Sequence, residues 1–184
     1  MRQKLELHPN STAAAAAHIE AEFTRLPSGI LTLRYLVTGS IDELALPPPL
    51  AIQRADELWR HTCLEVFLRA HSGDAYMEFN FAPSRQWASY HFDGYRSGMR
   101  NAKEVGPPEI GVNATATTFE LSVSLTLGDL PDLPGDVPWE IGLSAVIEQK
   151  DGSKSYWALS HPSGKPDFHH SDCFALQIPA ALRP

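Results

Sequence analysis

The sequence predicts an all-β protein, built as a two-sheet antiparallel β-sandwich of the jelly-roll or immunoglobulin-like type. Many short runs alternate apolar and polar side chains, as strands with one buried face do. Gly and Pro turns separate these runs, and no segment shows a sustained apolar period of 3.6 residues. The chain has 184 residues, 43% of them hydrophobic and 20% charged. That is enough for a single domain with its own core, which we expect over residues 1–184.

The first half of the chain contains two predicted hairpins. Residues 18–26 alternate apolar and polar side chains, and a Pro-Ser-Gly turn joins them to a second alternating run at residues 30–39. The prolines at 47–49 interrupt the pattern and predict a stiff surface connection. Alternation resumes at residues 61–69, and residues 75–92 hold two runs around a Pro-Ser turn. That turn predicts the second hairpin.

The second half continues in the same way. Residues 119–127 have the cleanest alternation in the chain, and residues 139–148 follow it. An Asp-Gly turn leads into residues 153–161, a strong hairpin signal, and residues 173–178 form the last predicted strand. We expect three apolar stripes to lie between the sheets: Leu64, Val66 and Leu68; Met77, Phe79 and Phe81; and Phe119, Leu121, Val123, Leu125 and Leu127.

A polar set interrupts this pattern on the side of the strands away from the core. Glu78 and Asn80 alternate with the core stripe of their run, and Glu65 does so in the preceding run. Two carboxylates on neighbouring strands repel each other unless a shared proton or a cation such as Arg60 or Arg96 neutralises them. One interpretation is a polar, concave binding face; the alternative is an ordinary solvated sheet face.

Three tryptophans favour the binding interpretation. Trp59, Trp87 and Trp157 each stand beside a polar or charged cluster. Trp87 shares the face of Glu78 and Asn80 if the turn keeps the register. Indole rings pack on the C–H faces of ligands while carboxylates and amides supply hydrogen bonds, a combination suited to a polyhydroxylated small molecule such as a sugar. The alternative is that Trp59 and Trp157 are core residues, with Trp87 nearer the surface.

The net charge and the length of the apolar stretches limit the choice of partners. The formal net charge is −7, which argues against nucleic acid or an anionic membrane surface as a partner. No apolar stretch approaches the roughly 20 residues of a membrane span. The start, MRQKLELHPN, lacks the apolar region of a secretion signal, so we expect a cytoplasmic protein. Cys63 and Cys173 are then expected to be free thiols.

Signatures of catalysis are missing from the sequence. It contains no nucleophile elbow, phosphate-binding loop or dinucleotide motif, so we expect a non-catalytic protein without a cofactor. His161 and the HHSDC stretch at residues 169–173 lack the paired spacing of a metal site, and no metal is expected. Two alternatives stay open. Glu65 and Glu78 could form a glycosidase pair, and a haem-binding redox module could use His161 or Met77 as an axial ligand.

Two motifs carry a family resemblance. They are W-x-x-T-C-x-E-x-F, made by Trp59, Thr62, Cys63, Glu65 and Phe67, and E-x-N-x-x-P, made by Glu78, Asn80 and Pro83. With YWALSHPSGKPDFHH near the end of the chain, they resemble the DOMON-like family related to type 9 carbohydrate-binding modules, in its branch of short single-domain bacterial proteins. The resemblance implies a β-sandwich whose concave sheet holds a sugar, or haem in other branches. The ligand-binding set that we expect is Trp59, Arg60, Glu65, Glu78, Asn80, Trp87, Arg96, Trp157 and His161.

Overall fold

The strands of the protein form one curled sheet. A computed structural model describes residues 1–12, 15–127 and 130–180; residues 181–184 of the predicted domain lie outside this range. The strands are β1 (Arg2–Leu7), β2 (Ala16–Arg25), β3 (Ile30–Gly39), β4 (Gln53–Arg54), β5 (Cys63–Ala70), β6 (Tyr76–Phe81), β7 (Gln86–Phe92), β8 (Arg100–Asn101), β9 (Glu109–Ala114), β10 (Thr118–Thr126), β11 (Trp139–Glu148), β12 (Lys154–Ala158) and β13 (Leu176–Ile178). Three short 3₁₀ turns join them: η1 (Ile41–Glu43), η2 (Leu58–Arg60) and η3 (Ser171–Cys173).

The all-β prediction is confirmed, with a difference in how the strands are joined. Among the described residues there is no α-helix, and no helix of the length and apolar character that crossing a membrane would require. The strands follow the order β4-β7-β6-β5-β11-β12-β1-β2-β3-β10-β9, and β1 pairs with both β12 and β2. The sheet is therefore continuous through β1 instead of divided into two. It is also mixed, because β4 pairs with β7 in parallel.

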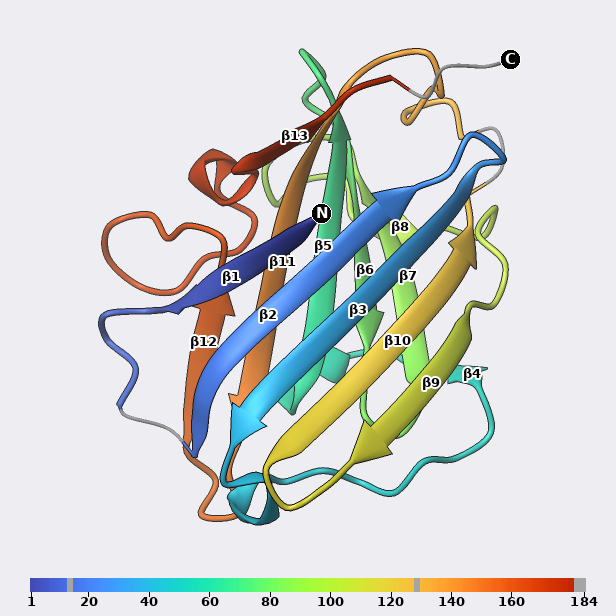
Figure 1. Cartoon of the computed structure of the whole chain (residues 1–184). Helices are drawn as coiled ribbons and strands as arrows, with labels where there is room; N and C mark the ends of the chain where they lie inside the picture. Colours follow the sequence, from blue (N-terminus) through green and yellow to red (C-terminus); the bar gives the residue numbers. More distant parts are fainter. Residues whose placement is uncertain (13–14, 128–129, 181–184) are drawn as a thin grey trace.

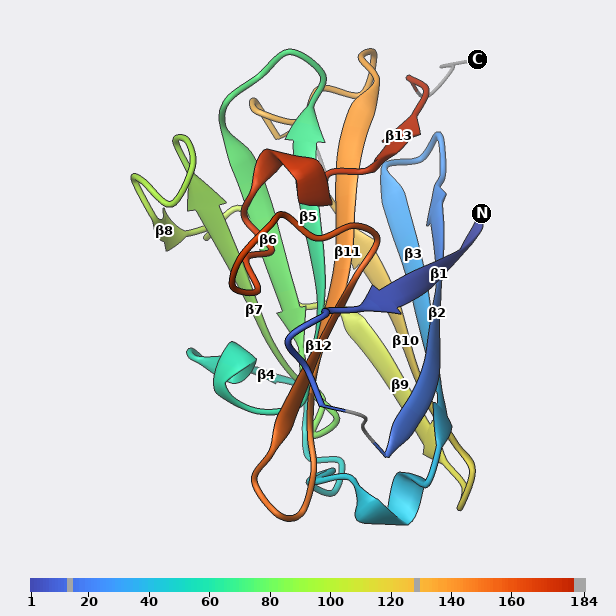
Figure 2. The same cartoon turned by 90° about the vertical axis from the view of Figure 1, so that its left-hand side faces the viewer.

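Curling brings the two halves of this sheet face to face. Figure 2 shows β2, β3, β9 and β10 as one layer opposite β5, β6, β7 and β11, and Figure 1 shows the same layers from the side of β2 and β3. The three apolar stripes expected between the layers are all buried in one hydrophobic cluster, as predicted. Burial of each such side chain stabilises the fold by about 1.5–3 kcal/mol.

The second layer is also covered on its outer face. Phe67, Tyr76 and Phe92 point away from the main core and are buried in a second cluster with Phe168 and Phe174. The last two belong to the segment between β12 and β13, which lies over the outer face of β5 and β11. Strands β5, β6 and β7 are therefore buried on both faces over most of their length.

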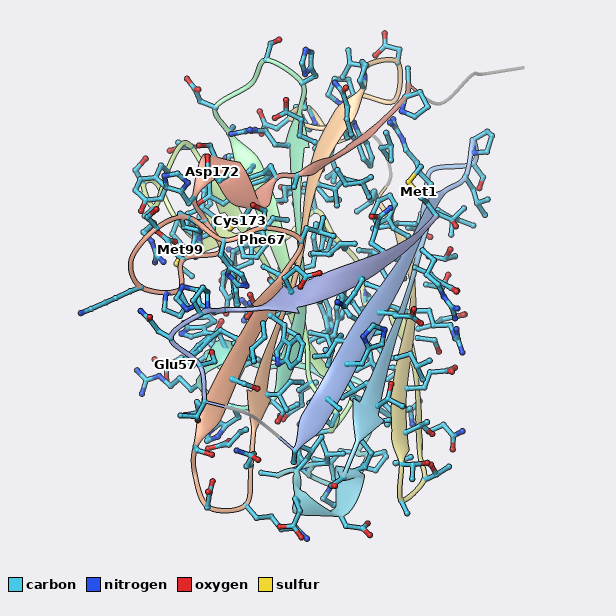
Figure 3. All side chains as sticks on the ribbon, turned by 60° about the vertical axis from the view of Figure 1, so that its left-hand side comes forward. Met1, Glu57, Phe67, Met99, Asp172 and Cys173 are labelled. Carbon is cyan, nitrogen blue, oxygen red and sulfur yellow. The ribbon has the colours of Figure 1, made fainter. Side chains whose placement is uncertain are left out.

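A glycine permits this close cover. Gly142 of β11 pairs with Phe67 of β5, and a side chain at this position would place its Cβ 3.1 Å from the backbone oxygen of Cys173. Figure 3 shows Phe67 beside the segment that carries Asp172 and Cys173, with Met99 on the same side of the molecule. The absence of a Cβ lets the covering segment approach the sheet.

Candidate functional site

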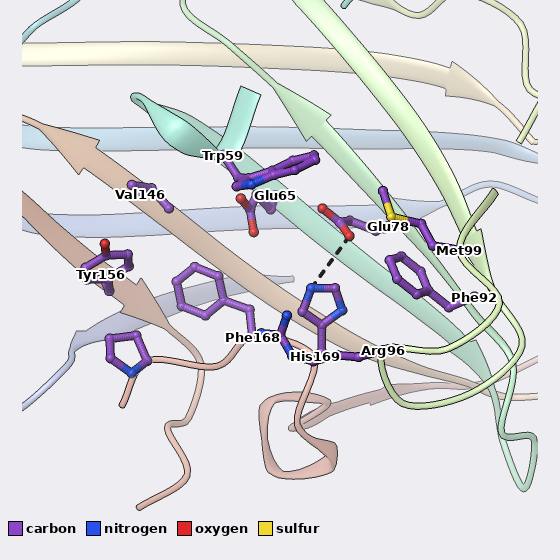
Figure 4. A pocket seen from close by; sticks show the side chains of 11 residues that line it. Trp59, Glu65, Glu78, Phe92, Arg96, Met99, Val146, Tyr156, Phe168 and His169 are labelled. Atoms are coloured by element: carbon purple, nitrogen blue, oxygen red, sulfur yellow. Dashed lines mark ion pairs between the residues drawn. The ribbon is translucent and has the colours of Figure 1, made fainter. Parts of the chain in front are cut away.

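A cavity of about 390 Å³ lies on the outer face of the second layer, at the edge of the covering segment. Strands β5, β6, β7, β11 and β12 form its floor, and loops form its rim. It is lined by Trp59, Glu65, Glu78, Phe92, Arg96, Met99, Val146, Tyr156, Pro166, Phe168 and His169 (Figure 4). The volume lies within the range of small-molecule sites, about 300–1,000 Å³.

Two carboxyl groups stand together on the floor. Glu65 of β5 pairs with Asn80 of β6, and Glu78 of β6 pairs with Phe67 of β5, so the two glutamates are diagonal neighbours on one face. Both are buried, with 2% and 4% of their surface exposed. The interpretation of a solvated sheet face is therefore wrong for these strands.

Glu65 has few polar partners. One oxygen, Oε2, accepts a hydrogen bond from the Ser144 hydroxyl at 3.3 Å. The other, Oε1, is buried and has no hydrogen-bond partner among the residues that the structure describes. Burial, followed by the nearby charge of Glu78, raises the pKa of Glu65 well above its ordinary value. A buried carboxyl oxygen without a partner is costly unless a bound molecule or water satisfies it.

Glu78 is better supported. The Asn80 side-chain amide donates a hydrogen bond of 2.6 Å to its Oε1. Burial raises the pKa of Glu78 from 4.5 to about 7, although the Asn80 hydrogen bond and the charge of Arg96 act in the opposite direction. Asn80 does not line the cavity. Its role is to orient the carboxyl group of Glu78 through this hydrogen bond.

His169 closes one side of the carboxyl pair. Its Nε2 lies 3.8 Å from Oε2 of Glu78 (Figure 4), and its Nδ1 lies 2.8 Å from the Tyr76 hydroxyl. That hydroxyl also accepts a hydrogen bond from the backbone N–H of Arg96. Burial and then Arg96 lower the pKa of His169 to about 4, so the ring is neutral at neutral pH.

The mouth of the cavity has an aromatic side chain, Trp59, and a positively charged one, Arg96. Trp59 is 36% exposed and packs edge-on against Tyr90, with ring centroids 5.8 Å apart. The Arg96 guanidinium donates to Oδ1 of Asp167 at 2.7 Å, which ties the loop after β7 to the covering segment. Met99, from the same loop, also lines the cavity and is half exposed.

Five of the nine predicted site residues are brought together here. Trp59, Glu65, Glu78 and Arg96 line the cavity, and Asn80 supports Glu78. The alternative that Trp59 belongs to the core is wrong, since η2 places it at the mouth.

The prediction for Trp87 was wrong. Trp87 is only 6% exposed and packs in the main core, where it pairs with Phe81. Past the end of β6, the Ala82 N–H still donates to the Gln86 backbone oxygen, so the turn beyond this pair has three residues, and its last one, Arg85, adopts φ of +68°. A three-residue loop pairs even positions with even ones, so Glu78 faces Tyr90 and Trp87 turns to the other side.

The remaining predictions are also corrected by the structure. Trp157 is 4% exposed and belongs to the main core, because β12 presents its neighbour Tyr156 to the cavity instead. Arg60 points to solvent and forms an ion pair with Glu57 at 2.8 Å. His161 is absent from the cavity lining; its Nε2 donates to the backbone oxygen of Glu6 at 2.8 Å.

The structure does not bring together the two candidate haem ligands, His161 and Met77. Within the described ranges no group of three or more His, Cys, Asp or Glu side chains is placed to hold a metal ion. Met77 is buried in the main core, on the opposite face from the cavity. It therefore does not meet His161 in one pocket. Cys63 and Cys173 are both buried free thiols, as expected.

Several lining residues were missed from the sequence. Phe92, Val146 and Tyr156 share the outward face of their strands with Glu78, a signal that the correct register would have given. Phe168 and His169 come from an irregular segment whose position no alternation predicts.

Comparisons with known proteins rest on structure alone. No family model matches the chain, and no curated protein matches its sequence. A candidate carbohydrate-binding protein from Bacteroides uniformis aligns with a TM-score of 0.61 at 12% identity, over 94% of this chain and 83% of that chain. A family 9 carbohydrate-binding module from Caldicellulosiruptor kristjanssonii, solved with cellotriose, aligns with a TM-score of 0.51 at 6% identity, over 87% of this chain and 74% of that one. The chain therefore has a fold similar to that of family 9 carbohydrate-binding modules.

Proposed function

We propose that this protein binds a saccharide in the cavity over β5 and β6, without transforming it. The observation that carries the proposal is the carboxyl pair, Glu65 and Glu78, buried on the floor of a cavity with aromatic walls. Buried acceptors with incomplete hydrogen bonding suit a ligand rich in hydroxyl donors. The solved structures with a similar fold support the same class of ligand, since one of them was determined with cellotriose.

The aromatic contact is assigned to Trp59 in place of Trp87. Its partly exposed indole at the mouth can pack on the apolar face of a sugar ring, at roughly 25 cal/mol per Å² of apolar area removed from water. Glu78, held by Asn80, then accepts hydroxyl hydrogen bonds of about 0.5–1.5 kcal/mol each. After the cost of immobilising the ligand, such terms correspond to dissociation constants in the micromolar to millimolar range.

The test is titration calorimetry with a panel of mono- and disaccharides. We expect the wild type to bind at least one sugar of the panel. Trp59→Ala should weaken the affinity by about tenfold or more, and the separate variant Glu78→Gln should also weaken it. Leu50→Ala is the control, because Leu50 is an exposed apolar residue that does not line the cavity. Absence of binding to every sugar, or binding that neither cavity substitution changes, would refute the proposal.

A second candidate is hydrolysis of a glycoside, and one observation favours it. Glu65 and Glu78 stand together on the cavity floor, and burial raises the pKa of both, that of Glu78 to about 7, as a general acid requires. A chromogenic nitrophenyl glycoside series distinguishes the two functions. Cleavage by the wild type that Glu78→Gln abolishes would establish the enzyme and displace the non-catalytic proposal.

A further inference from the structure

We propose that the cavity selects saccharides that carry a protonated amine, with the ammonium group bound between Glu65 and Glu78. The inference rests on the proposed function and specifies the chemical class of its ligand. Four features of the cavity carry it: an unpartnered carboxyl oxygen, a second carboxyl oxygen without a hydrogen bond, the lack of a dedicated counter-charge among the described residues, and the repulsion between two ionised carboxylates.

The first feature is Oε1 of Glu65. It is buried on the cavity floor and has no hydrogen-bond partner among the described residues. The other oxygen accepts a hydrogen bond from the Ser144 hydroxyl. A buried carboxylate is stable only when paired or richly hydrogen-bonded, and Glu65 is one of the residues that line the cavity.

The second feature is Oε2 of Glu78. Asn80 occupies the other oxygen of this carboxyl group. The nearest ring nitrogen, Nε2 of His169, is 3.8 Å from Oε2, beyond hydrogen-bond distance. Each glutamate therefore keeps one oxygen available on the same floor. A single tetrahedral ammonium group has three N–H donors, enough to serve both oxygens.

The third feature is the charge of the surroundings. The titratable groups around the pair are Cys63 beside Glu65, Tyr76 and His169 on the other side of Glu78, and Arg96 at the rim. Cys63, Tyr76 and His169 are neutral at neutral pH. Arg96 is the one permanent cation among the cavity-lining residues, and it is bound to Asp167. The two carboxyl groups thus lack a dedicated counter-charge within the described part of the chain.

The fourth feature separates an amine from a hydroxyl. A neutral hydroxyl can satisfy Oε1 of Glu65, but it leaves the repulsion between two ionised carboxylates in place, so at least one of them must hold a proton. An ammonium group supplies both the donors and the charge. A hydrogen bond with an ionised donor or acceptor is roughly twice as strong as a neutral one. A hydroxyl that meets a protonated carboxyl group forms the neutral kind, so an ammonium group that ionises the pair gains a preference of about tenfold or more.

The experiment compares glucosamine with glucose and N-acetylglucosamine by calorimetry at about pH 6. The acetyl group keeps the nitrogen but removes its charge, so it separates charge from shape. We expect glucosamine to bind about tenfold or more tightly than either neutral sugar. Repeating the glucosamine titration in buffers of different ionisation enthalpy should show proton release, because the bound amine favours the ionised carboxylates.

Variants identify the groups responsible. Glu65→Gln and Glu78→Gln should each reduce the preference for glucosamine to less than about threefold, while the binding of glucose changes less. Glu120→Gln is the matched control, since Glu120 lies on β10 in the opposite layer and binds Arg34. Thermal unfolding confirms that each variant is folded. If one of the two cavity variants does not fold, the other one alone tests the inference.

Two failures are distinguishable. If glucose and glucosamine bind equally, or if the preference persists in both cavity variants, the amine inference is overturned while saccharide binding stands. If no sugar binds, the proposed function and this inference fall together.

Discussion

Replacing Glu78 by Gln should stabilise the protein at neutral and alkaline pH and leave its stability unchanged in acid. Burial raises the pKa of Glu78 from 4.5 to about 7. Below pH 4.5 the carboxyl group is protonated in the folded and the unfolded chain, and its burial carries no charge penalty. Between pH 4.5 and about 7 the folded chain holds the proton that the unfolded chain has lost. The free energy of unfolding therefore falls with pH across this window, by about 3 kcal/mol.

His169 contributes with the opposite sign, so the wild-type profile alone does not reveal Glu78. The pKa of His169 is lowered from 6.5 to about 4, and stability from this group is lost as the pH falls from 6.5 toward 4. The difference between Glu78→Gln and the wild type removes this contribution, because His169 is present in both. That difference should grow from near zero at about pH 4 to about 3 kcal/mol at about pH 8.

Urea denaturation followed by tryptophan fluorescence, at closely spaced pH values, measures the difference. Glu120→Gln, on the opposite layer, removes a one-third exposed carboxylate that pairs with Arg34. It serves as the control, because the loss of this ion pair gives no gain in stability as the pH rises. A Glu78→Gln difference that stays constant from about pH 4 to about pH 8 would refute the claim that Glu78 is a buried acid with a raised pKa.

Three further substitutions and one chemical probe test the remaining assignments. Trp87→Ala should lower the free energy of unfolding by about 3–5 kcal/mol, as removal of a core indole does. Trp59→Ala should change it by about 1 kcal/mol or less and should instead weaken ligand binding. Chemical denaturation of both variants measures the two changes in stability. Tyr35→Phe should cost about 1 kcal/mol, because the buried Tyr35 hydroxyl donates to a backbone carbonyl of β5. Burial raises the pKa of Cys63 well above its ordinary value and that of Cys173 to about 12, so neither thiol should react with an aromatic disulfide reagent at about pH 8 until the protein is denatured.

Local alternation was sufficient to predict the strands and the main core. The stripes of β5, β6 and β10 all lie in the predicted cluster, because each strand needs only its own period of two to define its faces. The joining of the two layers through β1 was not predictable in this way. It depends on β1 pairing with β2 on one side and β12 on the other, and no local pattern specifies a strand's partners.

The failure at Trp87 has a different cause. Its face depends on whether the loop after β6 contains an odd or an even number of residues. The sequence Pro-Ser-Arg supports either choice, and Arg85 takes the left-handed conformation that usually favours Gly, Asn or Asp. A turn longer or shorter by one residue would have placed Trp87 on the cavity face. With the turn as it is, that face of β7 carries Tyr90 and Phe92 instead. A side chain across a turn is therefore predicted less securely than one within a run.

The composition of the strands offered a better signal for the site than face assignment across the turn. In YMEFNF the face of Glu78 and Asn80 also carries Tyr76, and in CLEVFL the face of Glu65 also carries Cys63 and Phe67. A solvated face would not carry this much apolar surface, whereas a strand buried on both sides does. A carboxyl group within such a strand has to be buried, and a buried carboxyl group raises its pKa or acquires a partner. The pKa of Glu65 and the pKa of Glu78 are both raised, and both side chains line the cavity, which is where the proposed ligand would supply their partner.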